Sequence, residues 1–119
     1  MCIRDRRVPA GRLVAATLDA VVADRRRDEA GSVAVISPGG LVRELHDALR
    51  AGLDEPVGYG AQGLGAPVSV LDPWTAKGLE FDSVVVVGPD AVARDAGAGS
   101  LYVAFTRPTR RLVVVEPAA

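Results

Sequence analysis

The stretch Ser83-Val84-Val85-Val86-Val87 decides the fold class, because it is apolar on both faces of an extended chain. Strands that are apolar on both faces are typical of parallel sheets covered by helices on each side. Three other short segments, at residues 32–36, 68–71 and 112–115, are also rich in apolar residues. The sequence therefore predicts strands in all of these segments.

Helical patterns separate these predicted strands. Residues 11–27 and 41–52 each carry apolar side chains at helical spacing, and Gly52 is a natural stop for the second helix. Ser37 to Gly40 should supply that helix with a cap and a first turn, whereas the glycine-rich segment 54–67 predicts a loop. Strands alternating with helices predict a three-layer α/β domain with a mainly parallel sheet, whose ligands bind at the carboxyl ends of the strands.

Length and composition exclude several classes of protein. The 119 residues suffice for one domain, and 14 Lys and Arg against 15 Asp and Glu leave no overall positive field for nucleic acid. The only cysteine, Cys2, excludes an internal disulfide and a cysteine-based zinc site. No apolar run approaches the roughly 18 residues of a membrane span. We therefore expect a soluble, cytoplasmic protein that has no metal ligands of its own.

The first six residues, Met1-Cys2-Ile3-Arg4-Asp5-Arg6, resemble the translated adapter sequence found at the ends of some assembled metagenomic contigs. We interpret residues 1–10 as a non-native or disordered leader. On that interpretation the natural protein extends further at its N-terminus, and the chain is a C-terminal fragment.

The connection from Asp72 to Asp82 is dense in side chains that can carry chemistry. Lys77 and Gly78 offer a cation and a main chain that a ligand can approach closely. Glu80 offers a carboxylate that can accept hydrogen bonds from sugar hydroxyls. A phosphate next to a ribose is a coherent ligand for this loop.

A short apolar helix over residues 100–105 should end before Pro108 and present Arg107, Arg110 and Arg111 together. An arginine at such a position can place its planar guanidinium against a phosphoryl group while that group is being transferred. For Arg110 and Arg111 a solvated basic turn is the simpler interpretation, and for His46 solvent exposure is.

Two ordered motifs carry a family resemblance. Ala76-Lys77-Gly78-Leu79-Glu80-Phe81-Asp82 resembles motif V, and Leu101-Tyr102-Val103-Ala104-Phe105-Thr106-Arg107 resembles motif VI, of the C-terminal RecA-like domain of UvrD- and Rep-type superfamily 1 helicases. The short spacing between them, and the sequence Thr106-Arg107-Pro108-Thr109, resemble most the HelD and HelR branch, helicase-like ATPases that act on RNA polymerase. Residues 11–119 would then be the C-terminal part of a second RecA-like domain.

The resemblance implies a role for each matching residue. Arg107 would be the catalytic arginine finger. Glu80 would contact the ribose of ATP, and Gly78 would line the nucleotide cleft between the two RecA-like domains. Thr75 and Lys77 would lie near a bound nucleic-acid strand. Trp74 departs from the family pattern, as does Asp72, and it could stack on a base or pack under the loop.

The implied cofactor is ATP with Mg²⁺, bound mainly by a first RecA-like domain, because the chain contains no Gly-Lys-Ser or Gly-Lys-Thr phosphate loop. The full-length protein should be an ATP-dependent helicase or translocase acting on single-stranded DNA or RNA, and the isolated fragment should be inactive. One alternative is a non-catalytic module that docks on RNA polymerase or regulates it. A free-standing nucleotide-binding domain is the third hypothesis.

Overall fold

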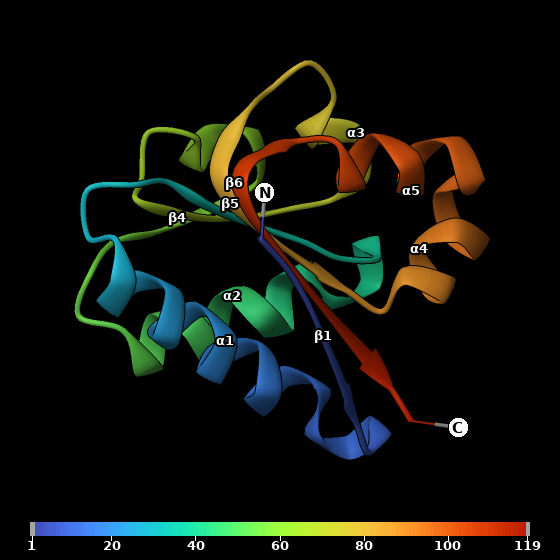
Figure 1. Cartoon of the computed structure of the whole chain (residues 1–119), viewed down its shortest axis with the longest axis horizontal. Helices are drawn as coiled ribbons and strands as arrows, with labels where there is room; N and C mark the ends of the chain where they lie inside the picture. The colour runs from blue at the N-terminus through green and yellow to red at the C-terminus, as the bar shows by residue number, and fades with distance from the viewer. Residues whose placement is uncertain (1, 119) are drawn as a thin grey trace.

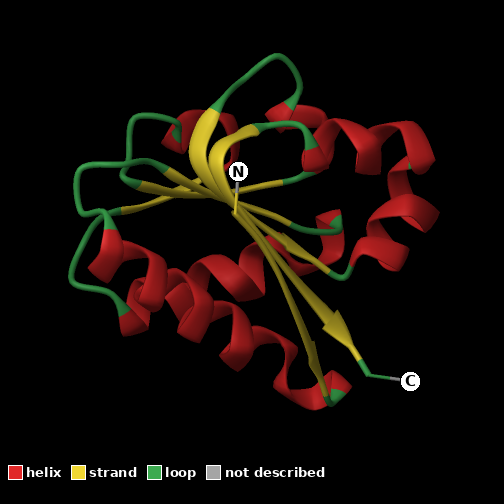
Figure 2. Cartoon of the chain, in the orientation of Figure 1, coloured by secondary structure: helices red, strands yellow, loops and turns green. Residues whose placement is uncertain are grey.

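The computed structural model describes residues 2–118, which fold into six strands and five α-helices (Figures 1 and 2). The strands are β1 (Cys2–Val8), β2 (Val33–Ile36), β3 (Val57–Tyr59), β4 (Val68–Leu71), β5 (Phe81–Val87) and β6 (Pro108–Pro117). The helices are α1 (Leu13–Arg27), α2 (Val42–Gly52), α3 (Pro73–Ala76), α4 (Pro89–Ala96) and α5 (Ala98–Phe105).

All six strands belong to one sheet, in the order β1-β6-β5-β2-β4-β3, and every pairing is parallel. The valine run of β5 lies between β2 and β6, with Val85 opposite Val35 on one side and Val113 on the other. This position explains the apolar character of both its faces. The predicted strands 32–36, 68–71, 83–87 and 112–115 are confirmed to within a few residues at their ends.

Helices cover both faces of the sheet, which confirms the predicted three-layer α/β fold (Figure 1). The side chains of Val85 and Val87 pack with α1 and α2, whereas those of Val84 and Val86 pack on the face covered by α3 and α5. Each such buried valine contributes about 1.5–3 kcal/mol of hydrophobic free energy. Alternation along a single strand thus builds both cores.

The two predicted amphipathic helices are present and pack against each other. In α2 the buried residues Val42, Leu45 and Leu49 recur at helical spacing and face the sheet. Gly52 ends this helix where a Cβ atom would lie 2.7 Å from the Leu18 side chain of α1. The glycine therefore permits the close approach of the two helices.

The segment 54–67 is more ordered than the predicted loop. Residues 57–59 form the edge strand β3, and Gly58 lies so close to Gly63 that a Cβ atom on either would clash with the main chain of the other. Helix α4 was not predicted either. The expected cap at Ser37 is also wrong, because this buried hydroxyl donates to the Pro38 carbonyl at 3.0 Å and the turn over residues 39–41 has no side-chain cap.

Residues 2–8 lie in the sheet as β1, although we expected a non-native or disordered leader over residues 1–10. Main-chain pairing with the exposed edge of β6 places them there, while most of their side chains stay in solvent. The non-native or disordered character of this leader stays a prediction. Across residues 2–118, no helix combines the length and the apolar character needed to cross a membrane.

Candidate nucleotide and nucleic-acid site

Helix α3 begins immediately after β4, and Asp72 determines where. The Asp72 Oδ1 accepts hydrogen bonds from the Thr75 main-chain N–H at 2.8 Å and from the Thr75 hydroxyl at 3.0 Å, and Pro73 occupies the first turn. These are the features of a helix N-cap. Asp72 thus departs from the helicase pattern for a local structural reason, and the Thr75 hydroxyl is already engaged by it.

Trp74 and Lys77 project from α3 and from the residue that follows it. Trp74 is 60% exposed, and the Lys77 Nζ lies 5.6 Å from the centre of its indole ring. A cation over an aromatic face is a favourable pair at the surface. The structure therefore brings together two residues predicted to contact a nucleic-acid strand, and Thr75 lies on the same helix.

Gly78 turns the chain from α3 toward β5. Its φ of +81° lies in the left-handed region, and an added Cβ atom would meet no heavy atom within 4 Å. A side chain would thus be disfavoured here by the backbone conformation rather than by lack of space. Lys77 and Gly78 are both exposed, and Gly78 has no side chain to keep a ligand from its main chain.

Arg107 follows the end of α5 and binds the same turn. Its Nε donates to the Val103 carbonyl at 3.1 Å, its Nη1 to the Leu79 carbonyl at 3.1 Å, and its Nη2 to the Thr106 hydroxyl at 3.2 Å. The Arg107 carbonyl accepts from the Phe81 N–H at 3.1 Å. Arg107 and the Gly78–Glu80 turn therefore lie on the same edge of the sheet.

Glu80, between Leu79 and Phe81, is exposed, and its carboxylate has no hydrogen-bond partner among residues 2–118. Glu80 and Arg107 directly precede the neighbouring strand starts at Phe81 and Pro108. The two residues thus lie at the amino ends of β5 and β6. We expected ligands at the carboxyl ends, and the segment from Asp72 to Lys77 follows such an end, that of β4.

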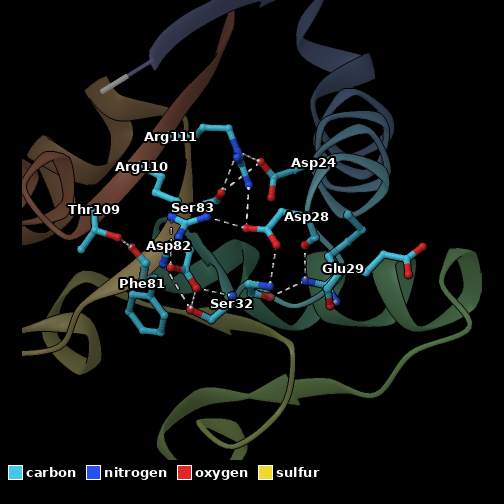
Figure 3. Close-up of polar contacts among 12 residues, drawn as sticks. Asp24, Asp28, Glu29, Ser32, Phe81, Asp82, Ser83, Thr109, Arg110 and Arg111 are labelled. Atoms are coloured by element: carbon cyan, nitrogen blue, oxygen red, sulfur yellow. Dashed lines mark hydrogen bonds and ion pairs between the residues drawn. The ribbon is translucent and has the colours of Figure 1, made fainter.

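The three arginines of the 107–111 segment do not converge, contrary to the sequence-based expectation. Arg111 lies against α1, where its Nε donates to the Asp24 Oδ1 at 2.6 Å and to the Ser83 hydroxyl at 3.1 Å (Figure 3). The Ser83 hydroxyl donates to the same Asp24 oxygen at 3.0 Å. With side chains 18% and 5% exposed, Arg111 and Asp24 form an ion pair shielded from solvent, so the solvated-turn interpretation of Arg111 is wrong.

Arg110 joins this cluster from the surface. Its Nη1 lies 3.3 Å from the Asp28 Oδ2 and its Nε 3.9 Å from the Asp82 Oδ1, while its side chain is 63% exposed (Figure 3). A register shift between Phe81 and Ser83 places three residue steps of β6 opposite two steps of β5. This bulge explains how two consecutive arginines reach the same acidic cluster, Arg111 at Asp24 of α1 and Arg110 at Asp28, the residue that follows α1.

Asp82 links the cluster to β2. Its Oδ2 accepts from the Ser32 N–H at 2.8 Å and from the Ser32 hydroxyl at 3.2 Å. The main-chain hydrogen bond from Ser32 is the main cause that lowers the pKa of Asp82, and the positive charges of Arg110 and Arg111 lower it further. In the same way, its position against Asp24 raises the pKa of Arg111.

Two further polar groups were not assigned structural roles from the sequence. Arg25, in α1, is buried and binds the Glu55 carboxylate at 2.7 Å, which lowers the pKa of Glu55. His46 is half-buried rather than exposed, with its Nε2 3.0 Å from the Val57 carbonyl and its ring edge against Tyr59. Arg25 thus links the end of α1 to the segment before β3, and His46 links α2 to the edge strand β3. In the described part of the chain, no cluster of three or more His, Cys, Asp or Glu could hold a metal ion.

Comparison with known proteins identifies the fold. Residues 67–115, which include both motifs, match the family model of the UvrD-like helicase C-terminal domain. The chain is similar to a UvrD-like helicase C-terminal domain. It also resembles the structure of the C-terminal domain of a possible DNA helicase from Lactobacillus plantarum WCFS1, with 25% identity, a TM-score of 0.73, and coverage of 99% of this chain and 74% of that one.

A second solved structure shares the fold alone. The Hef helicase domain of Pyrococcus furiosus superposes with a TM-score of 0.55 at 12% identity, over 87% of this chain and 26% of that one. No curated protein matches the sequence. Together with the all-parallel sheet, the structural similarities establish a RecA-like helicase C-terminal fold.

Proposed function

We propose that the chain is the second RecA-like domain of a superfamily 1 DNA helicase or translocase, of the HelD and HelR type, that acts in the cytosol. The observation that carries this proposal is the placement of Arg107 and Glu80 at the amino ends of adjacent strands, joined through Leu79 and Phe81. Two residues with these chemistries on one edge fit a nucleotide held between this domain and another.

The residues at this edge fit ATP. Glu80 presents a carboxylate without a protein partner among residues 2–118, suited to the hydroxyls of a ribose, and Gly78 presents an accessible main chain. Arg107 brings a planar fork that matches a phosphoryl group. ATP with Mg²⁺, bound mainly by the first domain, would supply the phosphoryl group that is transferred to water. Arg107 would act in trans as the arginine finger that stabilises the developing charge.

The surface formed by Trp74, Thr75 and Lys77 is the proposed contact with single-stranded DNA or RNA. An exposed indole can stack on a base, which contributes about 1–3 kcal/mol per base in single-strand binders. Lys77 supplies a positive charge next to that ring for a phosphate. Because Thr75 already bonds to Asp72, we expect it to contribute less to strand binding than Trp74 and Lys77 do.

The test uses the longer protein in which this domain is joined to its first RecA-like domain. Arg107→Ala should lower the ATP turnover rate by roughly 10³-fold or more, because the transition-state charge loses its counter-ion. Arg110→Ala is the matched control, since this arginine comes from the same segment but faces α1, and it should leave turnover close to wild type. Equal turnover in wild type and Arg107→Ala would eliminate the finger.

A second candidate function is a module that docks on RNA polymerase or regulates it without using ATP. The 60% exposure of Trp74 favours it, because large exposed aromatic rings are typical anchors of protein interfaces. Titration of single-stranded DNA at two salt concentrations, alongside a pull-down with RNA polymerase, separates the two candidates. Strand binding through phosphates must weaken steeply with salt, whereas polymerase capture that depends on Trp74 and resists salt supports the module.

A further inference from the structure

Glu80 lies between two residues that are each hydrogen-bonded to Arg107. On its N-terminal side the Leu79 carbonyl accepts from the Arg107 Nη1, and on its C-terminal side the Phe81 N–H donates to the Arg107 carbonyl, each at 3.1 Å. The first bond depends on the arginine side chain. The second is made by main chain alone and does not require the arginine side chain.

The rest of the turn offers little to fix Glu80. Gly78 provides a flexible point directly before Leu79, and the carboxylate of Glu80 has no hydrogen-bond partner in the described chain. The Leu79 N–H binds the Ala76 carbonyl at 3.1 Å, which holds the start of the turn but not the peptide unit that leads into Glu80. That peptide unit carries the Leu79 carbonyl, and its donor is Arg107.

We infer that Arg107 is a positioning residue for Glu80: its guanidinium holds the turn that presents this carboxylate to the ligand. The identity of that ligand as a nucleotide rests on the proposed function, whereas the holding role does not. Val103 and Thr106 orient the guanidinium for this task, since they accept from the Nε and the Nη2. Arg107 therefore has a role in the domain before any nucleotide is present.

This double use couples the two parts of the site. A guanidinium that turns toward a phosphoryl group withdraws the Nη1 donor from the Leu79 carbonyl, so Glu80 keeps only the main-chain link at Phe81. Contact with the terminal phosphate would thus loosen the turn that contacts the ribose. Loss of the terminal phosphate would let Arg107 return to Leu79.

Hydrogen exchange in the 119-residue chain tests the holding role without any nucleotide. Arg107→Ala should speed exchange of the Leu79 and Phe81 amides about tenfold relative to the core amides of Val85 and Val86, the loss expected for one charged hydrogen bond. Arg107→Lys should give an intermediate increase, because a single ammonium cannot reproduce the fork. Thr106→Val should give a smaller one, because it removes the Nη2 acceptor and the hydroxyl's own hydrogen bond to the Val103 carbonyl but leaves the Nη1 donor in place.

Arg50→Ala, which removes an exposed arginine of α2, is the control and should change none of these amides. The core amides in each spectrum separate a local effect from a global loss of stability. Unchanged exchange at Leu79 and Phe81 in Arg107→Ala, or an increase no larger than that of the core amides, would overturn the inference.

A second measurement in the longer protein distinguishes positioning from phosphate contact. ADP lacks the terminal phosphoryl group, so a residue that acts only as a finger should not affect its binding. As a positioning residue, Arg107 predicts severalfold weaker ADP binding in Arg107→Ala, with little added loss from Glu80→Gln in that background. Wild-type ADP affinity in Arg107→Ala would contradict this role even where ATP turnover falls. Normal turnover with weakened ADP binding would eliminate the finger and leave the positioning role intact.

Discussion

The two sides of the sheet at the amino ends of β5 and β6 use arginine in opposite ways. On the α1 side, Arg111 is paired with Asp24 at 2.6 Å, and both are largely shielded from solvent. On the α5 side, Arg107 bonds only to neutral oxygens, and Glu80 nearby has no partner among residues 2–118. The paired charges neutralise each other within the fold, although the buried Asp24 Oδ2 and Arg111 Nη2 have no hydrogen-bond partner among residues 2–118. A guanidinium on neutral acceptors, in contrast, can exchange them for an anion at small cost.

Proximity in sequence therefore says little about the role of an arginine. Arg107 and Arg111 are four residues apart, yet they face opposite layers of helices. The bulge at the start of β6 places Arg110 with Arg111 rather than with Arg107. The α1 side, where the charges are paired, holds the strands in position. The α5 side, where Arg107 and Glu80 lie, offers groups for binding.

The largest expected effect comes from breaking the ion pair on the α1 side. Asp24→Ala leaves the Arg111 guanidinium without its main counter-charge in a shielded position, and it removes the acceptor of the Ser83 hydroxyl. We expect the free energy of unfolding to fall by about 3–5 kcal/mol, the usual effect of breaking a buried pair. Chemical denaturation with guanidinium chloride measures it.

Arg110→Ala is the comparison for this prediction. Its side chain is 63% exposed, so its ion pairs with Asp28 and Asp82 should contribute less than about 1 kcal/mol. Equal losses in Asp24→Ala and Arg110→Ala would contradict the distinction between a shielded pair and a surface pair.

A smaller effect is expected on the α5 side, where the backbone conformation rather than charge pairing determines the geometry of the turn. Gly78→Ala places a Cβ atom on a residue with φ of +81°, and it should lower the free energy of unfolding by about 1–2 kcal/mol without a steric clash. Gly39→Ala is the matched control, since its φ is not positive and the space around it is open. If both variants have the same midpoint of thermal unfolding, Gly78 does not need its left-handed conformation.

The smallest effect concerns acid. The pKa of Asp82 is lower in the folded chain than in the unfolded one, mainly through the Ser32 main-chain N–H, and the pKa of Glu55 is lowered by Arg25. Their stabilisation is therefore complete above the ordinary carboxyl pKa and is lost as pH falls through the lowered folded values, below about pH 4. Both side chains are about a third exposed, which limits the effect.

Denaturation midpoints between pH 7 and pH 2.5 measure this dependence. Asp82→Asn cannot be protonated and should show a shallower decline than the wild type over the acid range. A decline that runs parallel in both proteins would assign the acid sensitivity to other carboxylates.

The sequence predicts the fold better than it predicts the polar clusters. Apolar runs such as Val84–Val87, and the periodicity of α2, are local signals, so strands and helices could be recognised without knowing their neighbours. Strand β3 was missed because its three residues lie among glycines that carry no periodicity. Helix α4 was missed because its eight residues begin at Pro89, and the preceding Gly88 makes a Gly-Pro pair that also fits a turn.

The candidate site divides along the same line. Gly78, Glu80 and Arg107 were found because they belong to two contiguous motifs. Asp24 and Arg111 are separated by 87 positions, and no local pattern marks them as a pair. The cap formed by Asp72 was recognisable in principle from the Asp-Pro-x-Thr sequence, in which an acceptor precedes a proline at the first helical position.

The bulge in β6 also determines how tolerant this segment is to changes in length. In a regular strand, deletion of one residue between Arg107 and Arg111 would reverse the face of every side chain on one side of the deletion. Here the supernumerary residue between Pro108 and Arg111 has no counterpart in β5, so its removal would restore regular pairing and turn either Arg110 or Arg111 away from α1. The spacing between Arg107 and Arg111, rather than the number of arginines, thus keeps the surface that can bind a ligand separate from the surface that supports the fold.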